Sequence, residues 1–554
     1  MDNNFILKYK HWFLVYILVI TFLLRLPSLF EPYWYGDEGI TLTMGQVWRS
    51  GLILYRDIHD NKPPLLYILA GVANNLFWFK FILTYWVLAT IGIFWGLIWQ
   101  INKRLLITPW LNIISTAIFA LLITIPYWEG NLANGEIFML APIMVGMYLV
   151  IINIPNDDQH LAAKITNLKI LTLFNQLLTR KDKTSTSKIE QIWLYLAGIC
   201  FGIGFLFKQP AVFDFISGLL FLSYLIRRKN FLASGYIFFT KTTILSLGFI
   251  TPVALAAVYF LLHNAGFDFI RDVFLNNFFY ISVWEPESKW GSTIAFGGSL
   301  QQRFIVLIML CAGIWLIRNK IKKTVLLILL WFVLSLFGAL LSGRPYPHYL
   351  LQVVPTLCIF IGWFIAGLNN LEFNKSLADI KRPTIIIPLF CFMLFYLSWA
   401  RIGFGNYPTR NYYKNFYDYI TGHKSSESYY QWFNLRVSNT YQLAAWLKFH
   451  TSSSDEVFIW GDDTMIYPLA NKIPPVSYIA AYHINQFNVQ PIVISELKND
   501  PPEYIIKLHS APDSFPQLDG FILQQYRLMG VLGEADVYKN IESLVLNIPP
   551  QDYY

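Results

Sequence analysis

The chain has 554 residues, of which 55% are hydrophobic and only 14% are charged. Soluble domains carry about 25% charged residues, so this composition excludes an ordinary soluble protein and indicates that membrane lipids cover much of the surface. The net charge of +8 comes from short basic runs between apolar segments. This pattern is typical of membrane orientation signals and excludes a nucleic-acid partner, because no basic stripe with interleaved aromatic residues occurs.

Apolar segments of about the length of a membrane-spanning helix recur along the first 400 residues. A helix needs about 20 apolar residues to cross a bilayer, and about 11 segments meet or approach that length. They are 12–30, 81–100, 107–126, 136–154, 192–207, 210–226, 234–262, 304–318, 324–342, 348–367 and 384–400. The sequence therefore predicts a polytopic α-helical membrane protein with a membrane domain over residues 1–400. Its first segment is long and lacks a small-residue cleavage site, so we do not interpret it as a signal peptide.

Basic residues between the spans predict the orientation. Lys8 and Lys10 precede the first span, which places the N-terminus in the cytoplasm. The later basic runs fall on the same side if residues 64–100 cross only once. These runs are 103–104, 164–188, 227–229, 320–323 and 381–382. We therefore expect Pro64 to about Phe79 to form a helix at the outer interface and 81–100 to cross; two crossings there would turn the later basic loops outward.

The composition changes after residue 401, where apolar spans give way to mixed segments. Three of these segments have the pattern of buried strands: Glu456–Trp460, Glu503–Ile506 and Glu534–Tyr538. Val437–Phe449 has helical spacing. Residues 401–554 are thus predicted to form one small extracytoplasmic α/β domain.

Ionisable residues recur at the predicted outer ends of separate spans, where they are costly unless paired or hydrated. Asp37 and Glu38 follow the first span. Adjacent carboxylates suit a general base and a partner that orients it or binds a metal, while the alternative is that Asp37 caps the amphipathic helix 38–50. Lys62 precedes two prolines that start the next helix. It suits a phosphate at headgroup depth, or it simply snorkels to the membrane surface.

Three further groups lie on the same predicted face. Glu136 stands where an apolar span begins, either capping that helix or facing the acids of the first loop across a shared cavity. Lys208 is flanked by apolar spans on both sides, so we expect an anionic partner for it. Arg344 and His348 lie in a tight turn between spans, where arginine suits bidentate phosphate binding and interfacial anchoring is the alternative.

Together these residues place two acids and three cations on one membrane face. Acids activate a hydroxyl, and cations neutralise a phosphate leaving group. The combination predicts displacement at a sugar carbon that bears a lipid phosphate. A transporter or lipid-glycan flippase is the second hypothesis, although transporters place paired charges near mid-membrane and often in repeated halves. An oligosaccharide ligase with a polyprenyl-pyrophosphate donor is the third.

The chain resembles the GT-C polyprenyl-phosphate-sugar glycosyltransferases, especially the bacterial protein-mannosyltransferase-like and aminoarabinose-transferase-like members. The motifs that carry the resemblance extend over roughly residues 10–365. They are Gly36-Asp37-Glu38, Asn61-Lys62-Pro63-Pro64-Leu65, Asn134-Gly135-Glu136, Phe207-Lys208-Gln209 and Gly343-Arg344 with His348-Tyr349. The resemblance implies a GT-C fold of about 11–13 transmembrane helices with an extracytoplasmic C-terminal domain. It also implies inverting transfer of a sugar from a polyprenyl-phosphate donor to a lipid, glycan or protein hydroxyl, on the extracytoplasmic face of the cell membrane.

The same resemblance implies roles for single residues. Asp37 matches the base that deprotonates the acceptor hydroxyl, and Glu136 matches a second acidic position. With Glu38, they form the predicted catalytic set. The residues implied to hold the donor phosphate are Lys62, Lys208, Arg344, His348 and Tyr349.

One departure from the family concerns a metal. Aminoarabinose-type members have a glutamate before Lys-Pro-Pro that can ligate a metal, whereas this chain has Asn61. The departure argues against a bound divalent metal, for which Asp60 and His59 would be the candidate ligands. A monophosphate leaving group can be balanced by lysine and arginine alone.

Neither the sugar nor the acceptor follows from the sequence. Contacts to the sugar are expected on outward loops such as 263–303. The candidates there are Asp268, Arg271, Trp284, Glu285 and Trp290. The C-terminal domain receives no residue-level role, and Gly461-Asp462-Asp463 is interpreted as a turn rather than a site.

Overall fold

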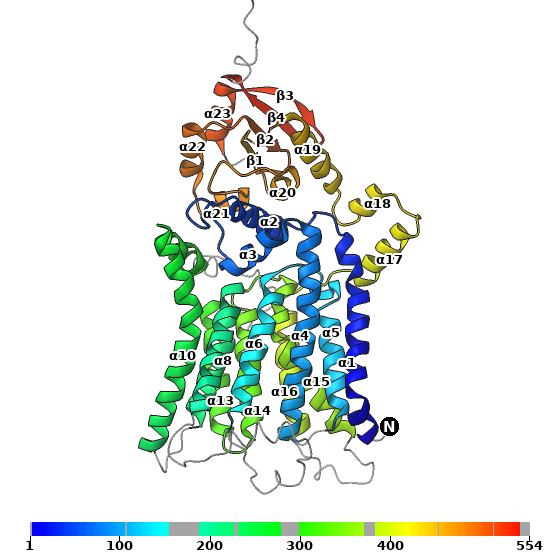
Figure 1. Ribbon diagram of the computed structural model, residues 1–554, viewed down its shortest axis with the longest axis vertical. Helices are drawn as coiled ribbons and strands as arrows, with labels where there is room; N and C mark the ends of the chain where they lie inside the picture. Colours follow the sequence, from blue (N-terminus) through cyan, green and yellow to red (C-terminus); the bar gives the residue numbers. More distant parts are fainter. Residues whose placement is uncertain are drawn as a thin grey trace, which may run out of the picture.

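The computed structural model describes residues 3–105, 108–154, 188–225, 231–278, 299–369, 383–452, 454–512 and 515–542. Long apolar helices form a bundle, and a small sheet with its own helices stands at one end of it (Figure 1). The bundle helices are α1 (Asn3–Arg25), α4 (Leu76–Leu105), α5 (Trp110–Leu122), α6 (Gly135–Ile152), α8 (Lys188–Phe207), α9 (Ala211–Tyr224), α10 (Phe231–Leu262), α13 (Leu300–Ile317), α14 (Lys323–Ala339), α15 (Val354–Asn369) and α16 (Pro383–Ile402).

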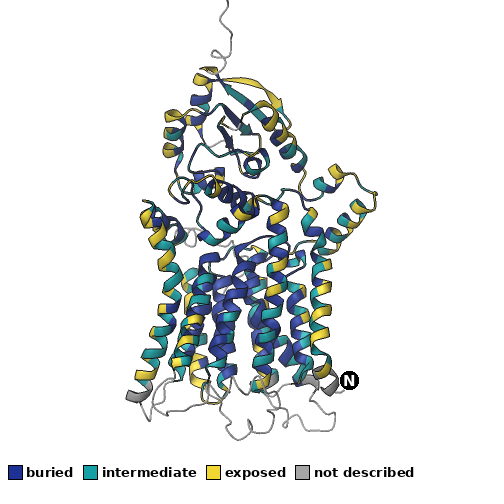
Figure 2. Ribbon diagram, viewed as in Figure 1, coloured by how far each residue is buried: buried dark blue, intermediate teal, exposed yellow. Residues whose placement is uncertain are grey.

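The length of these helices confirms the predicted polytopic membrane protein. In the part of the chain that the structure describes, eight segments are long and apolar enough to cross a membrane. Three shorter apolar helices of the bundle, α5, α9 and α14, accompany them. Figure 2 shows that buried residues fill the centre of the bundle, whereas α1 and α10 carry many exposed residues. Exposed apolar residues such as Tyr16, Leu255 and Ile308 lie on the outer helices, where lipid would cover them.

The segment after the first loop contains one helix long enough to cross a membrane, Leu76–Leu105, in line with the single crossing predicted for residues 64–100. Helix α3 (Pro64–Ala73) lies beside α2 (Gly36–Arg49) at the end of the bundle nearest the sheet (Figure 1). Its ten residues span about 15 Å, half of a hydrocarbon core. The expected end of this helix near Phe79 is wrong, because Asn74 has a left-handed backbone with φ of 70°. Helix α4 then starts at Leu76, whose N–H donates to the Tyr33 hydroxyl at 2.9 Å.

The basic runs that the structure describes lie at the end of the bundle away from the sheet. Residues 103–104 end α4, and residues 320–323 join α13 to α14. The runs 164–187, 227–229 and 381–382 lie outside the described residues.

Beyond α16 the chain forms a four-stranded sheet with the order β1-β2-β4-β3. The strands are β1 (Val457–Trp460), β2 (Tyr504–Leu508), β3 (Tyr526–Leu532) and β4 (Ala535–Asn540). Strands β1 and β2 are parallel, with Val457 opposite Tyr504, and the other pairs are antiparallel. The three predicted strands are present. Strand β3 was not predicted, because it is an edge strand whose side chains are mostly exposed and give no burial pattern.

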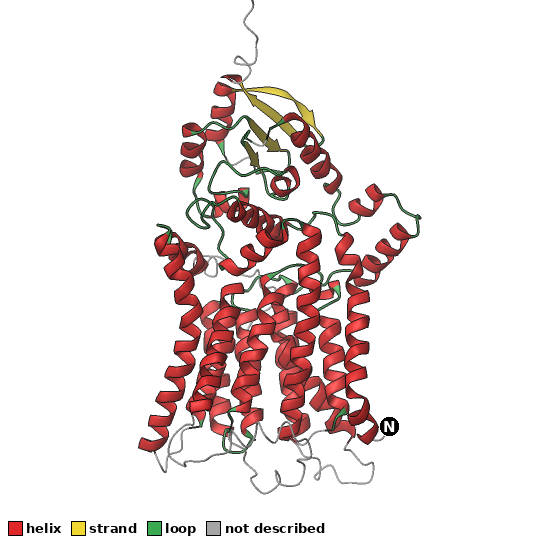
Figure 3. Cartoon of the chain, viewed as in Figure 1, coloured by secondary structure: helices red, strands yellow, loops and turns green. Residues whose placement is uncertain are grey.

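Short helices surround this sheet and connect it to the bundle. They are α17 (Thr409–Ile420), α18 (Ser426–Gln431), α19 (Val437–His450), α20 (Ile466–Ala470), α21 (Ala481–Gln486), α22 (Gln490–Asn499) and α23 (Pro516–Gln525). Helix α19 matches the predicted helix 437–449. Figure 3 shows that strands occur only at this end of the molecule among the described residues.

One hydrophobic core joins the first loop to the C-terminal part. It includes Met44 of α2, Tyr67 of α3, Phe269, and Val457 and Ile506 of the sheet. The sheet end is therefore packed directly on the loop that carries the first acidic motif. The division at residues 400 and 401 stays a prediction.

Candidate active site

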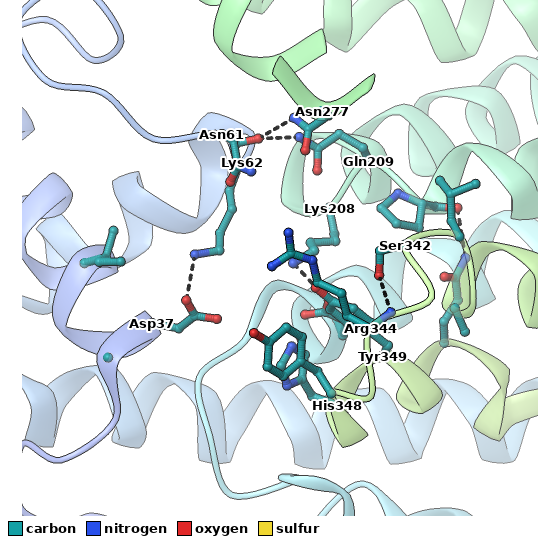
Figure 4. A pocket seen from close by; sticks show the side chains of 18 of the residues that line it. Asp37, Asn61, Lys62, Lys208, Gln209, Asn277, Ser342, Arg344, His348 and Tyr349 are labelled. Atoms are coloured by element: carbon teal, nitrogen blue, oxygen red, sulfur yellow. Dashed lines mark hydrogen bonds and ion pairs between the residues drawn. The ribbon is translucent and has the colours of Figure 1, made fainter. Parts of the chain in front are cut away.

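A cavity of about 400 Å³ lies where the first loop, the ends of several bundle helices and the C-terminal part meet. Small-molecule sites typically have volumes of about 300–1,000 Å³. Seven of the ten predicted site residues line it: Asp37, Lys62, Glu136, Lys208, Arg344, His348 and Tyr349. Figure 4 shows Asp37 and Lys62 on one side of the space and Lys208, Arg344 and Tyr349 on the other.

Asp37 faces the cavity from the first turn of α2. The predicted capping role is wrong, because Tyr35 is the N-cap residue of α2 and no side chain caps the helix. Asp37 Oδ1 instead lies 3.3 Å from Lys62 Nζ. Its side chain keeps 31% of its surface exposed, so a ligand in the cavity can reach it.

Lys62 is aimed into the cavity and not at the lipid. The Tyr55 hydroxyl donates to its carbonyl oxygen at 2.8 Å, and its own N–H donates to the Tyr67 hydroxyl. Pro63 and Pro64 then start α3. This backbone places Lys62 Nζ between two carboxylates, with Asp60 Oδ2 at 3.5 Å.

The charges around Asp37 and Lys62 determine the protonation of both side chains. Burial raises the pKa of Asp37, but the charges of Lys62, His348 and Lys208 outweigh it and hold that pKa below its ordinary value. Burial likewise lowers the pKa of Lys62, but Asp37 and Asp60 outweigh it and raise that pKa. Asp37 is therefore an ionised carboxylate and Lys62 a cation at neutral pH.

Glu136 and Lys208 form an ion pair of 2.9 Å in the cavity wall. The residue preceding Glu136 is Gly135, and a Cβ there would lie 2.7 Å from the Phe207 carbonyl oxygen. Glycine thus allows the start of α6 to touch the end of α8. The N-cap residue of α6 is Asn134, so Glu136 does not cap it. Of the two alternatives, Glu136 takes the cavity position, and it is the anionic partner expected for Lys208.

The turn before α15 carries the remaining cations. Gly343 has φ of +70°, a conformation that favours glycine, and the Ser342 hydroxyl accepts a hydrogen bond from the Arg344 N–H at 3.3 Å. Arg344 lines the cavity. Lys208 Nζ lies 5.5 Å from the centre of the Tyr349 ring, within cation–π range. These contacts bring the α8–α9 turn and this turn together.

His348 has a carboxylate partner that the sequence did not reveal. Its Nδ1 lies 2.5 Å from Glu129 Oε2, and the Tyr35 hydroxyl lies 3.4 Å from that same oxygen. Glu129 has a left-handed backbone, with φ of 58°, which is costly outside glycine. The segment η2 (Pro126–Trp128) before it and η7 (Pro347–Val353) hold the two residues together. A single glutamate in a short loop gives no sequence signal for such a pairing.

Glu38 does not line the cavity. Its Oε1 lies 2.7 Å from Lys80 Nζ and accepts the Ala133 N–H at 2.6 Å. Lys80 Nζ also lies 3.0 Å from Glu31 Oε2, and all three side chains are buried. Glu38 thus belongs to a buried charge cluster and not to the cavity, which corrects its predicted place beside Asp37.

The predicted metal ligands do not form a metal site. His59 Nδ1 pairs with Asp272 Oδ2 at 2.8 Å. Asp60 Oδ1 and Oδ2 accept hydrogen bonds from the Asn61 N–H and the Tyr67 hydroxyl. In the described parts of the chain, no group of three or more His, Cys, Asp or Glu side chains is arranged to hold a metal ion. The residues present therefore do not fit a divalent metal.

The loop 263–303 reaches the cavity through a residue other than those predicted. Asp268 and Arg271 pair with each other at 3.0 Å, in α11 (Gly266–Ile270) and the π-helical η5 (Arg271–Leu275), and neither lines the cavity. Asn277 does line it, and its side-chain amide donates to the Asn61 carbonyl oxygen at 2.8 Å. Gln209 donates to the same oxygen at 2.7 Å. The candidates Trp284, Glu285 and Trp290 lie outside the described residues.

The C-terminal part also reaches the cavity. Asp462, Tyr482 and His483 line it. Asp462, in the segment Gly461-Asp462-Asp463 that we interpret as a turn, thus also lines the cavity. Sequence order gave no sign of this, because more than 400 residues separate Asp462 from Asp37.

Comparison with known proteins identifies the fold. Neither a protein-family profile nor a curated protein sequence matches the chain. The crystal structure of ArnT from Cupriavidus metallidurans bound to undecaprenyl phosphate is similar, with a TM-score of 0.52, 14% identity, and coverage of 96% of this chain and 98% of that one. The same protein in the apo state gives a TM-score of 0.50, 13% identity and coverage of 97% and 99%.

A more distant similarity is to the oligosaccharyltransferase AglB from Archaeoglobus fulgidus in complex with an inhibitory peptide and a dolichol-phosphate. It has a TM-score of 0.43 and 11% identity, and it covers 98% of this chain and 75% of that one. The chain thus shares the membrane fold of the two ArnT structures.

Proposed function

We propose that this protein is a membrane glycosyltransferase that moves a sugar from a polyprenyl-phosphate donor to a hydroxyl acceptor. The observation that carries the proposal is the cavity at the end of the bundle. In this cavity the ionised carboxylate of Asp37 lies together with Lys208, Arg344 and His348. The fold is that of ArnT, which is bound to undecaprenyl phosphate in the similar structure, and this supports a lipid phosphate as the leaving group.

The reaction would proceed by direct displacement. Asp37 accepts the proton of the acceptor hydroxyl, whose oxygen attacks the anomeric carbon of the sugar. The bond from that carbon to the phosphate oxygen breaks, and polyprenyl phosphate leaves with both bonding electrons. Attack opposite the leaving group inverts the anomeric carbon. The residues here proposed to hold the phosphate charge are Lys208, Arg344, His348 and Tyr349.

Lys62 would control the protonation of Asp37, and Glu136 would control the position of Lys208. Lys62 lies within 3.5 Å of both Asp37 and Asp60, so it keeps the base ionised and can also contact the phosphate. Glu136 positions Lys208 through the ion pair of 2.9 Å. We assign Glu38 a structural role in place of the catalytic one.

We further propose that residues 1–400 are the membrane domain and that residues 401–554 lie with the cavity on the extracytoplasmic side. Residues 103–104 and 320–323, at the far end of the bundle, support a cytoplasmic position for that end. This topology also places the N-terminus in the cytoplasm.

Loss of either cavity cation should weaken donor binding. We expect Lys208→Ala and Arg344→Ala to raise the Kd for undecaprenyl phosphate about tenfold or more, because each removes a charge-assisted contact to phosphate. Binding of the acceptor should change less. Titration of the purified protein in nanodiscs measures both. Lys320→Ala, an exposed lysine at the opposite end of the bundle, is the matched control. An unchanged Kd for undecaprenyl phosphate in both cavity variants would contradict their phosphate role.

Lys62 should set the acid limit of the activity. Asp37 acts as a base only when ionised, so activity is present above its pKa and is lost as the pH falls through it. The wild-type pKa lies below the ordinary value of 3.8, whereas Lys62→Met removes the largest charge that lowers it. We expect the acid limb of log kcat/KM, measured from about pH 3 to pH 8, to move to higher pH in Lys62→Met and to stay in place in Lys62→Arg. The same acid limb in all three proteins would refute this role.

A further inference from the structure

The segment that follows β1 closes the cavity on the side of the sheet. Asp462 comes two residues after the end of β1, and Tyr482 and His483 lie in α21. We call these three residues the C-terminal wall. All three line the same cavity as Asp37, and Figure 1 shows α21 between the bundle and the sheet.

This wall is fixed to the first loop. The Thr43 hydroxyl donates to the Thr464 carbonyl oxygen at 3.1 Å, and the His59 N–H donates to the Ser477 carbonyl oxygen at 2.7 Å. A Cβ at Gly39 would lie 2.9 Å from the Met465 backbone nitrogen, so α2 touches the backbone after β1. The segment that carries the wall is therefore packed and hydrogen-bonded directly to the first loop.

The wall provides no positive charge. Burial lowers the pKa of His483 to about 4, so its imidazole is neutral at pH 7. Asp462 is a carboxylate that accepts the Tyr482 N–H at 2.9 Å, and the Tyr482 residue is 39% exposed. A carboxylate, a neutral imidazole and an exposed aromatic ring do not suit a phosphate. They suit hydroxyl groups and the apolar face of a sugar ring.

His483 also has a ring nitrogen that forms no hydrogen bond with the described residues. The side chain is 4% exposed, and its Nδ1 is buried without a hydrogen-bond partner among the described residues. Its Nε2 lies 3.9 Å from Asp60 Oδ1, beyond hydrogen-bond distance. Buried polar atoms are normally paired, so a ligand beside this imidazole would supply a missing partner.

The direction of the donor follows from its chemistry. Its lipid chain must stay in the membrane, and its phosphate is expected at Lys208 and Arg344, at the ends of the bundle helices. The sugar is bonded to the phosphate on the side away from the lipid. It therefore projects towards the part of the cavity that the C-terminal wall closes.

We propose that the C-terminal wall binds the hydroxyl groups and ring of the transferred sugar and sets which sugar the protein accepts. The proposal rests on the proposed function, because it takes the phosphate position from it. Asp462 accepts hydrogen bonds from sugar hydroxyls, the neutral imidazole of His483 accepts or donates one, and the Tyr482 ring packs on the sugar face. The wall thereby gives residues after 401 a direct part in substrate selection.

The test measures binding without an acceptor, so that only donor contacts count. Wild-type protein in nanodiscs is titrated with undecaprenyl phosphate and with a panel of undecaprenyl-phosphate hexoses and pentoses. Tyr482→Ala and His483→Ala, with the milder His483→Asn in case the alanine variant fails to fold, are titrated in the same way. His509→Gln is the control, because His509 is an exposed histidine of the same sheet region, paired with Asp536.

The expected result is that wild type binds one sugar-bearing lipid more tightly than the bare lipid phosphate. The wall variants should bind that lipid about tenfold more weakly, the effect of one net hydrogen bond, with less than about a twofold change for bare undecaprenyl phosphate. An equal loss for both lipids, no loss for either, or no sugar that improves binding to wild type would overturn the proposal. Failure of wild type to bind undecaprenyl phosphate at all would instead refute the proposed function.

Discussion

Replacing Asp37 by asparagine is expected to abolish sugar transfer while leaving membrane insertion intact. Asparagine keeps the shape of the side chain but cannot accept the proton of the acceptor hydroxyl. Loss of a positioned general base typically costs about 10²- to 10⁴-fold in rate, and we expect kcat to fall within or beyond this range. The measurement is transfer by purified protein supplied with lipid-linked donor.

Binding of the donor should separate this effect from misfolding. Asp37 lies in the same cavity as the cations that we propose to hold the phosphate, so removing its negative charge should leave the Kd for undecaprenyl phosphate equal or lower. Asp519→Asn is the matched control, because Asp519 is a half-exposed aspartate paired with Lys507 on the sheet. Normal transfer by Asp37→Asn in a lipid-supplied assay would overturn the assignment of the base.

Replacing Lys80 by methionine should cause the largest loss of stability. Lys80 and Glu31 are fully buried, and Glu38 almost so. Glu31 also accepts the Tyr412 hydroxyl at 2.5 Å and the Asn131 amide at 2.7 Å. Removing one partner of a buried ion pair costs about 3–5 kcal/mol, because a charge stays buried without compensation. The free energy of unfolding in detergent, measured with a chemical denaturant, should fall by about that amount.

Two further variants make this expectation specific. Lys414→Met removes a lysine that is 69% exposed and pairs with Asp418 one turn away, and exposed pairs of this kind contribute about 0–1 kcal/mol. The double variant Lys80→Met with Glu38→Gln should recover part of the loss, since it removes one of the uncompensated carboxylates. A Lys80→Met protein as stable as Lys414→Met would show that the cluster does not hold the first loop in place.

The buried cluster of Glu31, Glu38 and Lys80 would also hold Asp37, the proposed base, in its position in the cavity. Glu38 accepts the Ala133 N–H, three residues before Glu136 at the start of α6. The helix that carries Asp37 is thereby tied to the segment that carries the second cavity acid. Tyr412 of α17 ties the same cluster to the chain that leads to the sheet. Buried and paired charges therefore link the three parts that meet at the cavity.

The membrane fold and most of the charged residues that line the cavity could be predicted from the sequence alone. A helix that crosses hydrocarbon must be long and apolar, because its backbone groups can pair only with one another, so the apolar spans are visible in the sequence. Charged residues at the ends of such spans are conspicuous, because a lipid environment otherwise excludes them. This is why Asp37, Lys208 and Arg344 could be found without a structure.

Which residues share the cavity depends on the tertiary packing and could not be predicted from the sequence. Asp37 and Glu38 are adjacent in sequence, but successive residues of a helix point about 100° apart, so one faces the cavity and the other faces Lys80. Glu129 and His348 are far apart in the chain and meet only because two turns pack together. Asp462 and His483 reach the cavity because the sheet shares a core with the first loop. Contacts of this kind depend on how elements pack, and the local pattern of residues carries no record of them.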